Sequence, residues 1–317
     1  MTDVQKWQIS ADQGGQRLDN YLLSRLKGAP RTLVYRIIRS GEVRVNRGRV
    51  RPDYRIQVGD EIRIPPLRLA LRDDTPVHLG ADFSKHLNER IIHEADGLIV
   101  LNKPHGMAVH GGSGIHLGVI EAMRSLRPDY RFLELVHRID RDTSGLLLMA
   151  YQRSALLRAQ EALRQGEVVK KYLAILNGVQ LQPSICVEHP LHKYNLASGE
   201  MRVRVDAQGK PAHSEFERIW SCQGLSGVSV RIFTGRTHQI RVHALSLGMP
   251  VLGDEKYGNA TISPSWQRSG FGRLFLHASA IELPWQDGTL LFEVPLDGAM
   301  QELWNKGQTG QMSDLNQ

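Results

Sequence analysis

After residue 90 the apolar side chains mostly follow a two-residue alternation or form short unbroken runs, patterns that predict β-strands. "RIIHEADGLIVLNKP" predicts two strands joined by an Ala-Asp-Gly turn. Further strands are expected at 134–140, 144–151, 168–178, 201–205, 213–220, 227–233, 273–283 and 291–296. The helical spacing of three and four residues appears in fewer places, which are the segment before Pro128, residues 153–166 and residues 236–248. Strands outnumber helices and rarely alternate with them, so the sequence predicts an α+β domain with a largely antiparallel mixed β-sheet flanked by helices and loops.

The first 66 residues have a different pattern. "RLDNYLLSRLKG" (17–28) and "RTLVYRIIRSG" (31–41) each carry one apolar stripe and end at a glycine, which predicts two short helices. "VRVNRGRV" (43–50) alternates around an Asn-Arg-Gly turn and predicts a hairpin, and a further short strand is expected within 54–65. These residues therefore predict a small N-terminal α/β domain.

Pro65 and Pro66 end this module and divide the chain. We expect an N-terminal domain at 1–66, a linker of mixed charge and no sustained period at 67–90, a second domain at 91–305 and a polar tail at 306–317.

The charge is concentrated at the N-terminal end. The chain has 40 Lys and Arg against 33 Asp and Glu, a net charge of +7. Residues 1–70 hold 14 basic and 7 acidic residues, so the whole excess lies there, and the remaining residues hold 26 of each sign. Between residues 31 and 51 there are seven arginines and one acid. Such a surface attracts polyanions, of which nucleic acid is the commonest in a cell, although a solvated basic face without a partner is the alternative.

Other global features exclude some classes of protein. The chain is 41% hydrophobic, which is enough for an ordinary core, and no run of 18 apolar residues predicts a membrane span. Its first fifteen residues lack the apolar stretch of a signal peptide. Cys186 and Cys222 stand far apart without a CxxC motif, so we expect a reducing cytoplasmic location and no cysteine-based zinc site.

The most unusual segment is "HRIDRDTSG" (137–145), a polar run between two predicted strands. A kinase-type catalytic loop is disfavoured because no glycine-rich phosphate loop or D-F-G sequence accompanies it. Asp140 and Asp142 share one strand face and could bind a metal, yet none of the histidines shows a metal-site spacing such as H-E-x-x-H. A structural turn with Arg–Asp pairs is equally compatible. The residue pattern alone leaves these interpretations open.

Two resemblances narrow the choice. "RLDNYL", "SGEVRVN" and "VGDEIRI" resemble the alpha-L RNA-binding domain over about residues 16–65. This implies binding of structured RNA through the second helix and the hairpin, with seven arginines as the candidate phosphate contacts: Arg31, Arg36, Arg39, Arg44, Arg47, Arg49 and Arg51.

Residues 90–300 resemble the RluA-type RNA pseudouridine synthases. "HRIDRDTSGLLLMA" is similar to the family signature H-R-L-D-x-x-T-S-G-L-L-L, with Ile139 in place of Leu and Tyr151 where Lys is common. "VLNKPHGMAVHGG" (100–112), "KKYLAILNG" (170–178), "TGRTHQIRVHALSLGMPVLGD" (234–254) and "RLFLHASAIEL" (273–283) match further family motifs in the family's order.

This resemblance implies an isomerase that converts uridine in RNA to pseudouridine. It assigns the essential carboxylate to Asp140, the cation that keeps it ionised to Arg236, and stacking on the flipped base to Tyr172. Arg138 would fill the gap left by the base, and Leu276 would line the pocket. The carboxylate could attack the base, attack the sugar or remove a sugar proton. Nothing is oxidised in this reaction, so no cofactor and no metal are expected.

The resemblance further implies ribosomal RNA of the large subunit, or its precursor, as the partner. We expect a monomer in the cytoplasm with no membrane contact and no obligate protein partner. Two alternative functions remain at this point. One is a non-catalytic RNA-binding protein, which an assay for pseudouridine would identify, and the other is a metal-dependent RNA hydrolase using the Asp pair, which EDTA would inhibit.

Overall fold

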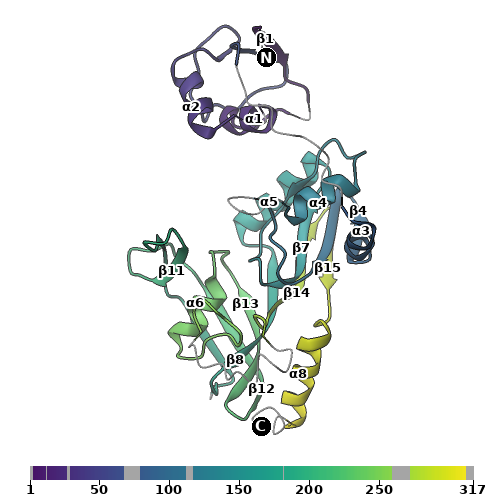
Figure 1. Ribbon diagram of the computed structural model, residues 1–317, viewed down its shortest axis with the longest axis vertical. Coiled ribbons are helices and arrows are strands. Elements are labelled where there is room, and N and C mark those ends of the chain that lie inside the picture. Colours follow the sequence, from purple (N-terminus) through teal and green to yellow (C-terminus); the bar gives the residue numbers. More distant parts are fainter. Residues whose placement is uncertain are drawn as a thin grey trace. The chain divides into compact units, whose positions relative to one another are not determined.

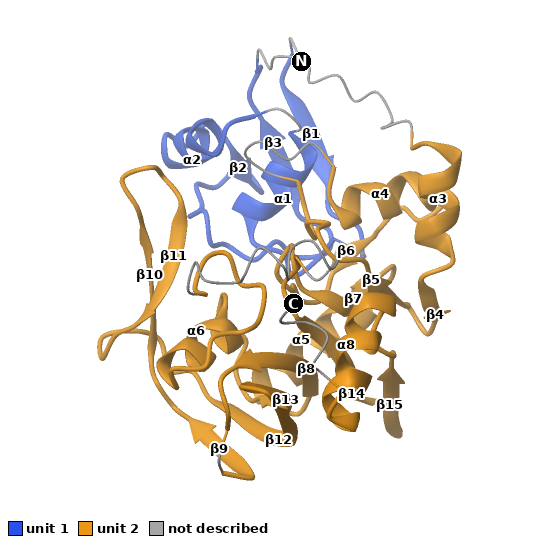
Figure 2. Ribbon diagram, turned by 60° about the horizontal axis from the view of Figure 1, so that its bottom comes forward, with its two compact units in different colours: residues 1–76 blue, residues 77–317 orange. Residues whose placement is uncertain are grey.

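The computed structural model describes residues 3–11, 13–26, 29–67, 79–111, 117–180, 182–258 and 272–311 (Figure 1). The chain divides into two compact units, residues 1–76 and 77–317, which Figure 2 shows in different colours. No helix among the described residues has the length and apolar character needed to cross a lipid bilayer.

The first unit packs two helices on a small antiparallel sheet of strand order β1-β3-β2. Its elements are β1 (Gln5–Gln8), α1 (Leu18–Arg25), α2 (Arg31–Arg39), β2 (Arg44–Val45) and β3 (Glu61–Ile64). The apolar stripes of both helices are buried with the inward residues of β3, as the periodicity predicted. The predicted hairpin at 43–50 is reduced to a turn, because Asn46 and Arg47 have positive φ and β2 pairs mainly with β3.

The second unit is built on a ten-stranded mixed sheet, which confirms the predicted fold class. The main path runs β4-β5-β7-β14-β8-β13-β12-β9, while β15 pairs with β14 and β6 with β7. The strands are β4 (Ile91–Ala95), β5 (Leu98–Lys103), β6 (Glu134–Leu135), β7 (Ser144–Ala150), β8 (Val169–Asn177), β9 (Ser184–Val187), β12 (Ser214–Cys222), β13 (Leu225–Ile232), β14 (Leu276–Trp285) and β15 (Gly288–Glu293). A separate hairpin consists of β10 (Leu191–Asn195) and β11 (Met201–Val205).

Helices cover both faces of this sheet. On one face, α5 (Arg153–Gln165) and α6 (Gln239–Ser246) pack on alternate residues of the central strands. The opposite face is covered by α3 (Ala81–Asn88) and α4 (Val119–Leu126) over β5 and β7, and by α8 (Gly298–Thr309) over β8, β12 and β13. The strand alternation follows from this, since successive side chains enter different cores.

The single parallel pairing that the structure describes in this sheet lies at its centre, between β7 and β14. Ser144 pairs with His277 and Gly145 with Ala278, and every other described strand pair is antiparallel. Gly145 has φ +102°, and a Cβ there would lie 2.2 Å from the carbonyl oxygen of Ala278. Only glycine fits this close approach, which explains the glycine that ends the polar segment.

Three expectations from the sequence differ from the structure. The segment predicted as a linker contains α3, whose Leu87 is buried under the sheet, while residues 68–78 lie outside the described residues. The predicted tail begins inside α8, because Gly307 packs against the ring of Trp220 and extends the buried stripe. The strand expected at 134–140 ends at Leu135, since the imidazole of His137 takes the place of a backbone acceptor for the N–H of Leu148.

Candidate active site

Asp140 lies in the turn immediately before β7, at the parallel junction of the sheet. The N–H of Thr143 donates to the carbonyl oxygen of Asp140 over 3.2 Å, which closes a turn and directs the chain into β7. The Asp140 side chain is 24% exposed, so its carboxylate is accessible to a ligand while it remains in contact with the protein.

The cation beside Asp140 is Arg241 of α6. Its Nη1 lies 3.4 Å from Oδ2 of Asp140, and its Nε and Nη2 each donate to the carboxylate of Asp254 over 2.7 Å. The ring of Tyr257 lies under the guanidinium, with 5.1 Å between the guanidinium carbon and the ring centre. Arg241 is only 5% exposed and Asp254 is fully buried, so the ion pair holds the guanidinium in a fixed orientation beside Asp140.

The neighbouring carboxylates keep the guanidinium of Arg241 protonated. Burial by itself would lower the pKa of Arg241, but the hydrogen bonds and the negative charge of Asp254, together with the charge of Asp140, raise that pKa above its ordinary value. Asp254 is in turn held by the backbone N–H groups of Lys256 and Tyr257, at 2.9 and 3.0 Å. Arg241 therefore stays protonated although it is desolvated, and its charge attracts a neighbouring carboxylate.

A second pair links α6 to the same place. His238, the residue before α6, has the left-handed φ of +52° and its Nδ1 lies 2.7 Å from the hydroxyl of Tyr257. That hydroxyl also accepts the N–H of Val203 over 2.9 Å, and burial raises the pKa of Tyr257 to about 12. Burial lowers the pKa of His238, so the imidazole is neutral near pH 7 and leaves Arg241 as the cation at this position.

Tyr172 and Leu276 lie on the sheet face that α5 and α6 cover. Tyr172 of β8 pairs with Ala278 of β14, and Ala278 also pairs with Gly145 of β7. One strand, β14, therefore lies between Tyr172 and the start of β7. Leu276 is the diagonal neighbour of Tyr172 on the same face, and both are at least 90% buried. Burial first, and the charge of Asp140 second, raise the pKa of the Tyr172 hydroxyl.

The last residue of β5 and the loop after it hold the backbone of the Asp140 turn. Lys103 is fully buried, and its Nζ donates to the carbonyl oxygens of Pro104, Met107 and Arg141, each over 2.8 Å. His105 places Nδ1 2.7 Å from the carbonyl oxygen of Asp142. Burial lowers the pKa of Lys103 to about 7.

The sequence prediction for the cation has to be corrected. Arg236 does not occupy that position, because its Nε donates to the carbonyl oxygen of Pro211 over 2.8 Å and its side chain is exposed. Both arginines belong to one motif, "GRTHQIRVH". The usable signal was that Arg241 stands between Ile240 and Val242 within a helix: an arginine in an apolar stretch is expected to be buried and paired.

Arg138 and Asp142 lie on either side of Asp140. Arg138 is exposed and its Nη1 lies 3.0 Å from Nε2 of His110. Asp142 is bound by the guanidinium of Arg141 at 2.8 and 3.2 Å. Within the described ranges, no group of three or more His, Cys, Asp or Glu side chains is placed to hold a metal ion.

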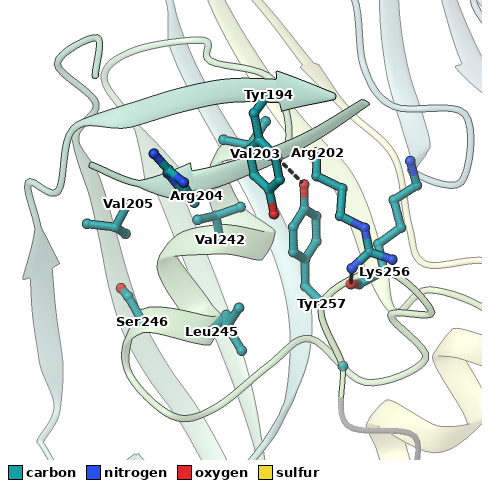
Figure 3. Close-up of a pocket in the computed structure, with 11 residues that line it drawn as sticks. Tyr194, Arg202, Val203, Arg204, Val205, Val242, Leu245, Ser246, Lys256 and Tyr257 are labelled. Atoms are coloured by element: carbon teal, nitrogen blue, oxygen red, sulfur yellow. Dashed lines mark hydrogen bonds between the residues drawn. The ribbon is translucent and has the colours of Figure 1, made fainter. Parts of the chain in front are cut away.

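A hollow of about 400 Å³ lies behind Tyr257, between the β10–β11 hairpin and α6 (Figure 3). Its lining combines apolar side chains with those of two arginines and one lysine. These cations are ion-paired: Arg204 lies 2.9 Å from Asp206, while Arg202 and Lys256 lie 3.5 and 3.0 Å from Glu200. The hollow adjoins the site at Tyr257. The cations that line it are ion-paired to Glu200 and Asp206. Its lining residues are Tyr194, Arg202, Val203, Arg204, Val205, Val242, Leu245, Ser246, Lys256, Tyr257 and Gly258.

The predicted RNA-contact residues of the first unit all lie on its surface. Arg31, Arg36 and Arg39 of α2 border an open hollow of about 750 Å³, and Arg39 lies over the ring of Tyr35 at 5.7 Å. The arginines that follow on β2 and its turn are exposed as well: Arg44, Arg47, Arg49 and Arg51.

Comparison with known proteins agrees with this geometry. Residues 97–246 match the family model of RNA pseudouridylate synthases, and residues 16–62 match the model of the S4 domain. "Ribosomal large subunit pseudouridine synthase C" of Haemophilus influenzae is 48% identical over 307 residues, covering 96% of this chain and 95% of its own length. The protein of the same name from Escherichia coli K12 is 45% identical over 302 residues, covering 94% and 95%.

A solved structure also matches the fold. Human RNA pseudouridylate synthase domain containing 4 is 26% identical, with a TM-score of 0.59, over 74% of this chain and 95% of that one. Identity of 48% across nearly the whole length, in a chain that carries an Asp–Arg pair at the junction of its mixed sheet, settles the classification. This chain belongs to the RNA pseudouridylate synthase family, whose members isomerise uridine in RNA to pseudouridine.

Proposed function

We propose that this chain isomerises specific uridines to pseudouridine in ribosomal RNA of the large subunit or its precursor, with Asp140 as the essential group. The similarity over 95% of the length of relatives named for the large ribosomal subunit supports the substrate. The basic surface of the first unit and its match to the S4 domain support RNA binding by residues outside the catalytic unit. Work on ribosomal RNA would place the protein in the cytoplasm.

The geometry of Asp140 carries the proposal. Attack on the base, attack on the sugar and removal of a sugar proton all need an ionised carboxylate next to the nucleoside. Asp140 is partly exposed to a ligand and contacts Arg241, whose charge is fixed by Asp254. The guanidinium of Arg241 is already paired and oriented before RNA binds. Little free energy is therefore needed to reorient it during the reaction.

The other side chains have roles in holding the substrate. A uridine in folded RNA has to leave its stack before it can reach Asp140. The ring of Tyr172, which is separated from the start of β7 by the strand β14, would stack on the flipped base. Leu276 beside it would form an apolar side of the pocket. Arg138 is exposed two residues before Asp140, where it can occupy the space that the base leaves.

Pseudouridine mapping tests the function. Large-subunit RNA from a strain that lacks the gene should lose pseudouridine at defined positions, and the wild-type gene should restore them. A gene carrying Asp140→Asn should not restore them. An unchanged pseudouridine map in the strain without the gene would refute the proposed substrate.

A further inference from the structure

Among the described residues, the last residue of β5 and the loop after it contact the Asp140 segment in three places. Two of them are contacts to backbone carbonyls, from Lys103 to Arg141 and from His105 to Asp142. The third joins two side chains: Nε2 of His110 lies 3.0 Å from Nη1 of Arg138. The first two contacts hold the turn itself, whereas the third holds a side chain that faces solvent.

The two ring nitrogens of His110 have different hydrogen-bond partners. Its Nδ1 lies 3.0 Å from the carbonyl oxygen of Gly111, which can only accept, so Nδ1 carries a proton. A guanidinium can only donate, so Nε2 must offer its lone pair to Arg138. In this arrangement the ring donates through Nδ1 and accepts through Nε2. The charged groups that the described residues place around His110 are Arg138 and the carboxylate of Glu121.

The backbone beneath His110 is rigidly supported. Oε2 of Glu121, in the first turn of α4, accepts the N–H groups of Gly111 at 3.0 Å and Gly118 at 3.1 Å. The carbonyl oxygens of the two residues before His110 bind the first N–H groups of α4. A Cβ on Gly118 would lie 2.5 Å from Cα of His110, so the loop and the helix are in direct contact. The backbone that carries the His110 side chain thus has a fixed position.

We propose that His110 is a positioning residue for the isomerisation: its Nε2 holds the guanidinium of Arg138 in place before the side chain moves into the space of the flipped base. The inference rests on the proposed function, in which Arg138 takes that space. An exposed arginine samples many rotamers, and a fixed acceptor restricts them without removing its charge. The effect belongs to the step after RNA binding, since the contact orients the guanidinium of Arg138 and leaves its charge unchanged.

The test measures single-turnover rates and RNA dissociation constants on one large-subunit RNA fragment. His110→Ala should slow the single-turnover rate by about 3- to 10-fold, the effect of losing one ordinary hydrogen bond, with the dissociation constant changed less than about twofold. His110→Gln keeps an acceptor near the position of Nε2 and should restore the rate to within about twofold. In an Arg138→Ala background, His110→Ala should have no further effect, because its partner is absent.

His86→Ala is the matched control. His86 accepts a hydrogen bond from Nε of Arg90 over 2.9 Å on the surface at α3, so this change removes the same kind of contact outside the site and should leave the rate unchanged. The inference is overturned if His110→Ala retains the wild-type rate, if His110→Gln is equally damaged, if the two single effects multiply, or if the loss lies only in RNA affinity. Absence of pseudouridine with the wild-type protein would instead refute the proposed function.

Discussion

Replacing Arg241 by methionine should damage both stability and turnover. Methionine retains an unbranched apolar chain in place of the aliphatic part of Arg241. It lacks the guanidinium, which donates twice to Asp254 and contacts Asp140. Asp254 is fully buried and would lose its countercharge. Asp140 would lose the cation that it contacts.

The expected magnitude follows from these interactions. Breaking a buried ion pair by removing one partner costs about 3–5 kcal/mol. Asp254 keeps two backbone N–H donors, so the lower end applies, about 3 kcal/mol. In a domain of this size, each kcal/mol lowers Tm by about 2–4 °C, so Tm should fall by about 6–12 °C. At a temperature where the variant is folded, turnover should fall by about 100-fold or more, as when a donor to a catalytic charge is removed.

Arg236→Met is the matched control, because Arg236 is exposed and its side chain donates to the carbonyl of Pro211 instead of to a carboxylate. Its Tm should stay within about 2 °C of the wild type. The assays are thermal unfolding by circular dichroism and single-turnover pseudouridine formation. If Arg236→Met abolished turnover while Arg241→Met retained it, the assignment of Arg241 as the partner of Asp140 would be refuted.

Three further predictions concern other parts of the chain. Tyr172→Phe should keep most of the turnover, whereas Tyr172→Ala should remove a stacking interaction worth about 1–3 kcal/mol; equal turnover of the two variants would contradict a stacking role. The pKa of Lys103 is about 7 in the folded protein, and that of an unfolded lysine is about 10.4. Between these pH values the unfolded state binds more protons than the folded state. The contribution of Lys103 to the free energy of unfolding therefore rises with pH. In urea unfolding from pH 7 to 10, the wild type should therefore gain stability relative to Lys103→Met, with the exposed Lys85→Met as control; a constant difference would contradict the shift. Removal of residues 1–70 should leave a folded catalytic unit and flatten the slope of log affinity against log salt by roughly 0.7–0.9 for each phosphate that is no longer neutralised, and an unchanged slope would show that these residues do not bind RNA.

The sequence predicted well those features that depend on local pattern. The unbroken apolar run of β7 and the amphipathic α5 follow directly from periodicity, and β7 directly follows the polar segment that contains Asp140. The mixed, largely antiparallel sheet followed from the order of strands and helices. Helix α3 was missed because only Leu87 of its eight residues is buried, which leaves almost no apolar stripe to detect.

The partner of Asp140 depends on tertiary structure and was therefore missed. Arg236 and Arg241 are five residues apart, and the left-handed backbone of His238 turns the chain between them before α6 begins. Which arginine reaches Asp140 is set by that turn and by Asp254, 13 residues after Arg241 and fully buried. The hydrophobic pattern contains no signal for the turn or for the pairing with Asp254, although the apolar neighbours Ile240 and Val242 indicate that Arg241 is buried.

The central claim is that the Asp140 carboxylate performs the isomerisation. Forming pseudouridine replaces the hydrogen at C5 of the base, so RNA that carries tritium at uridine C5 releases it as the reaction proceeds. With a large-subunit RNA fragment of this kind, the wild type should release tritium, and Asp140→Asn should be slower by at least about 10³-fold with nearly unchanged RNA affinity. Asp142→Asn should be far milder, because Asp142 is bound to Arg141 beside the site. Tritium release by purified Asp140→Asn at a rate near that of the wild type would contradict the account.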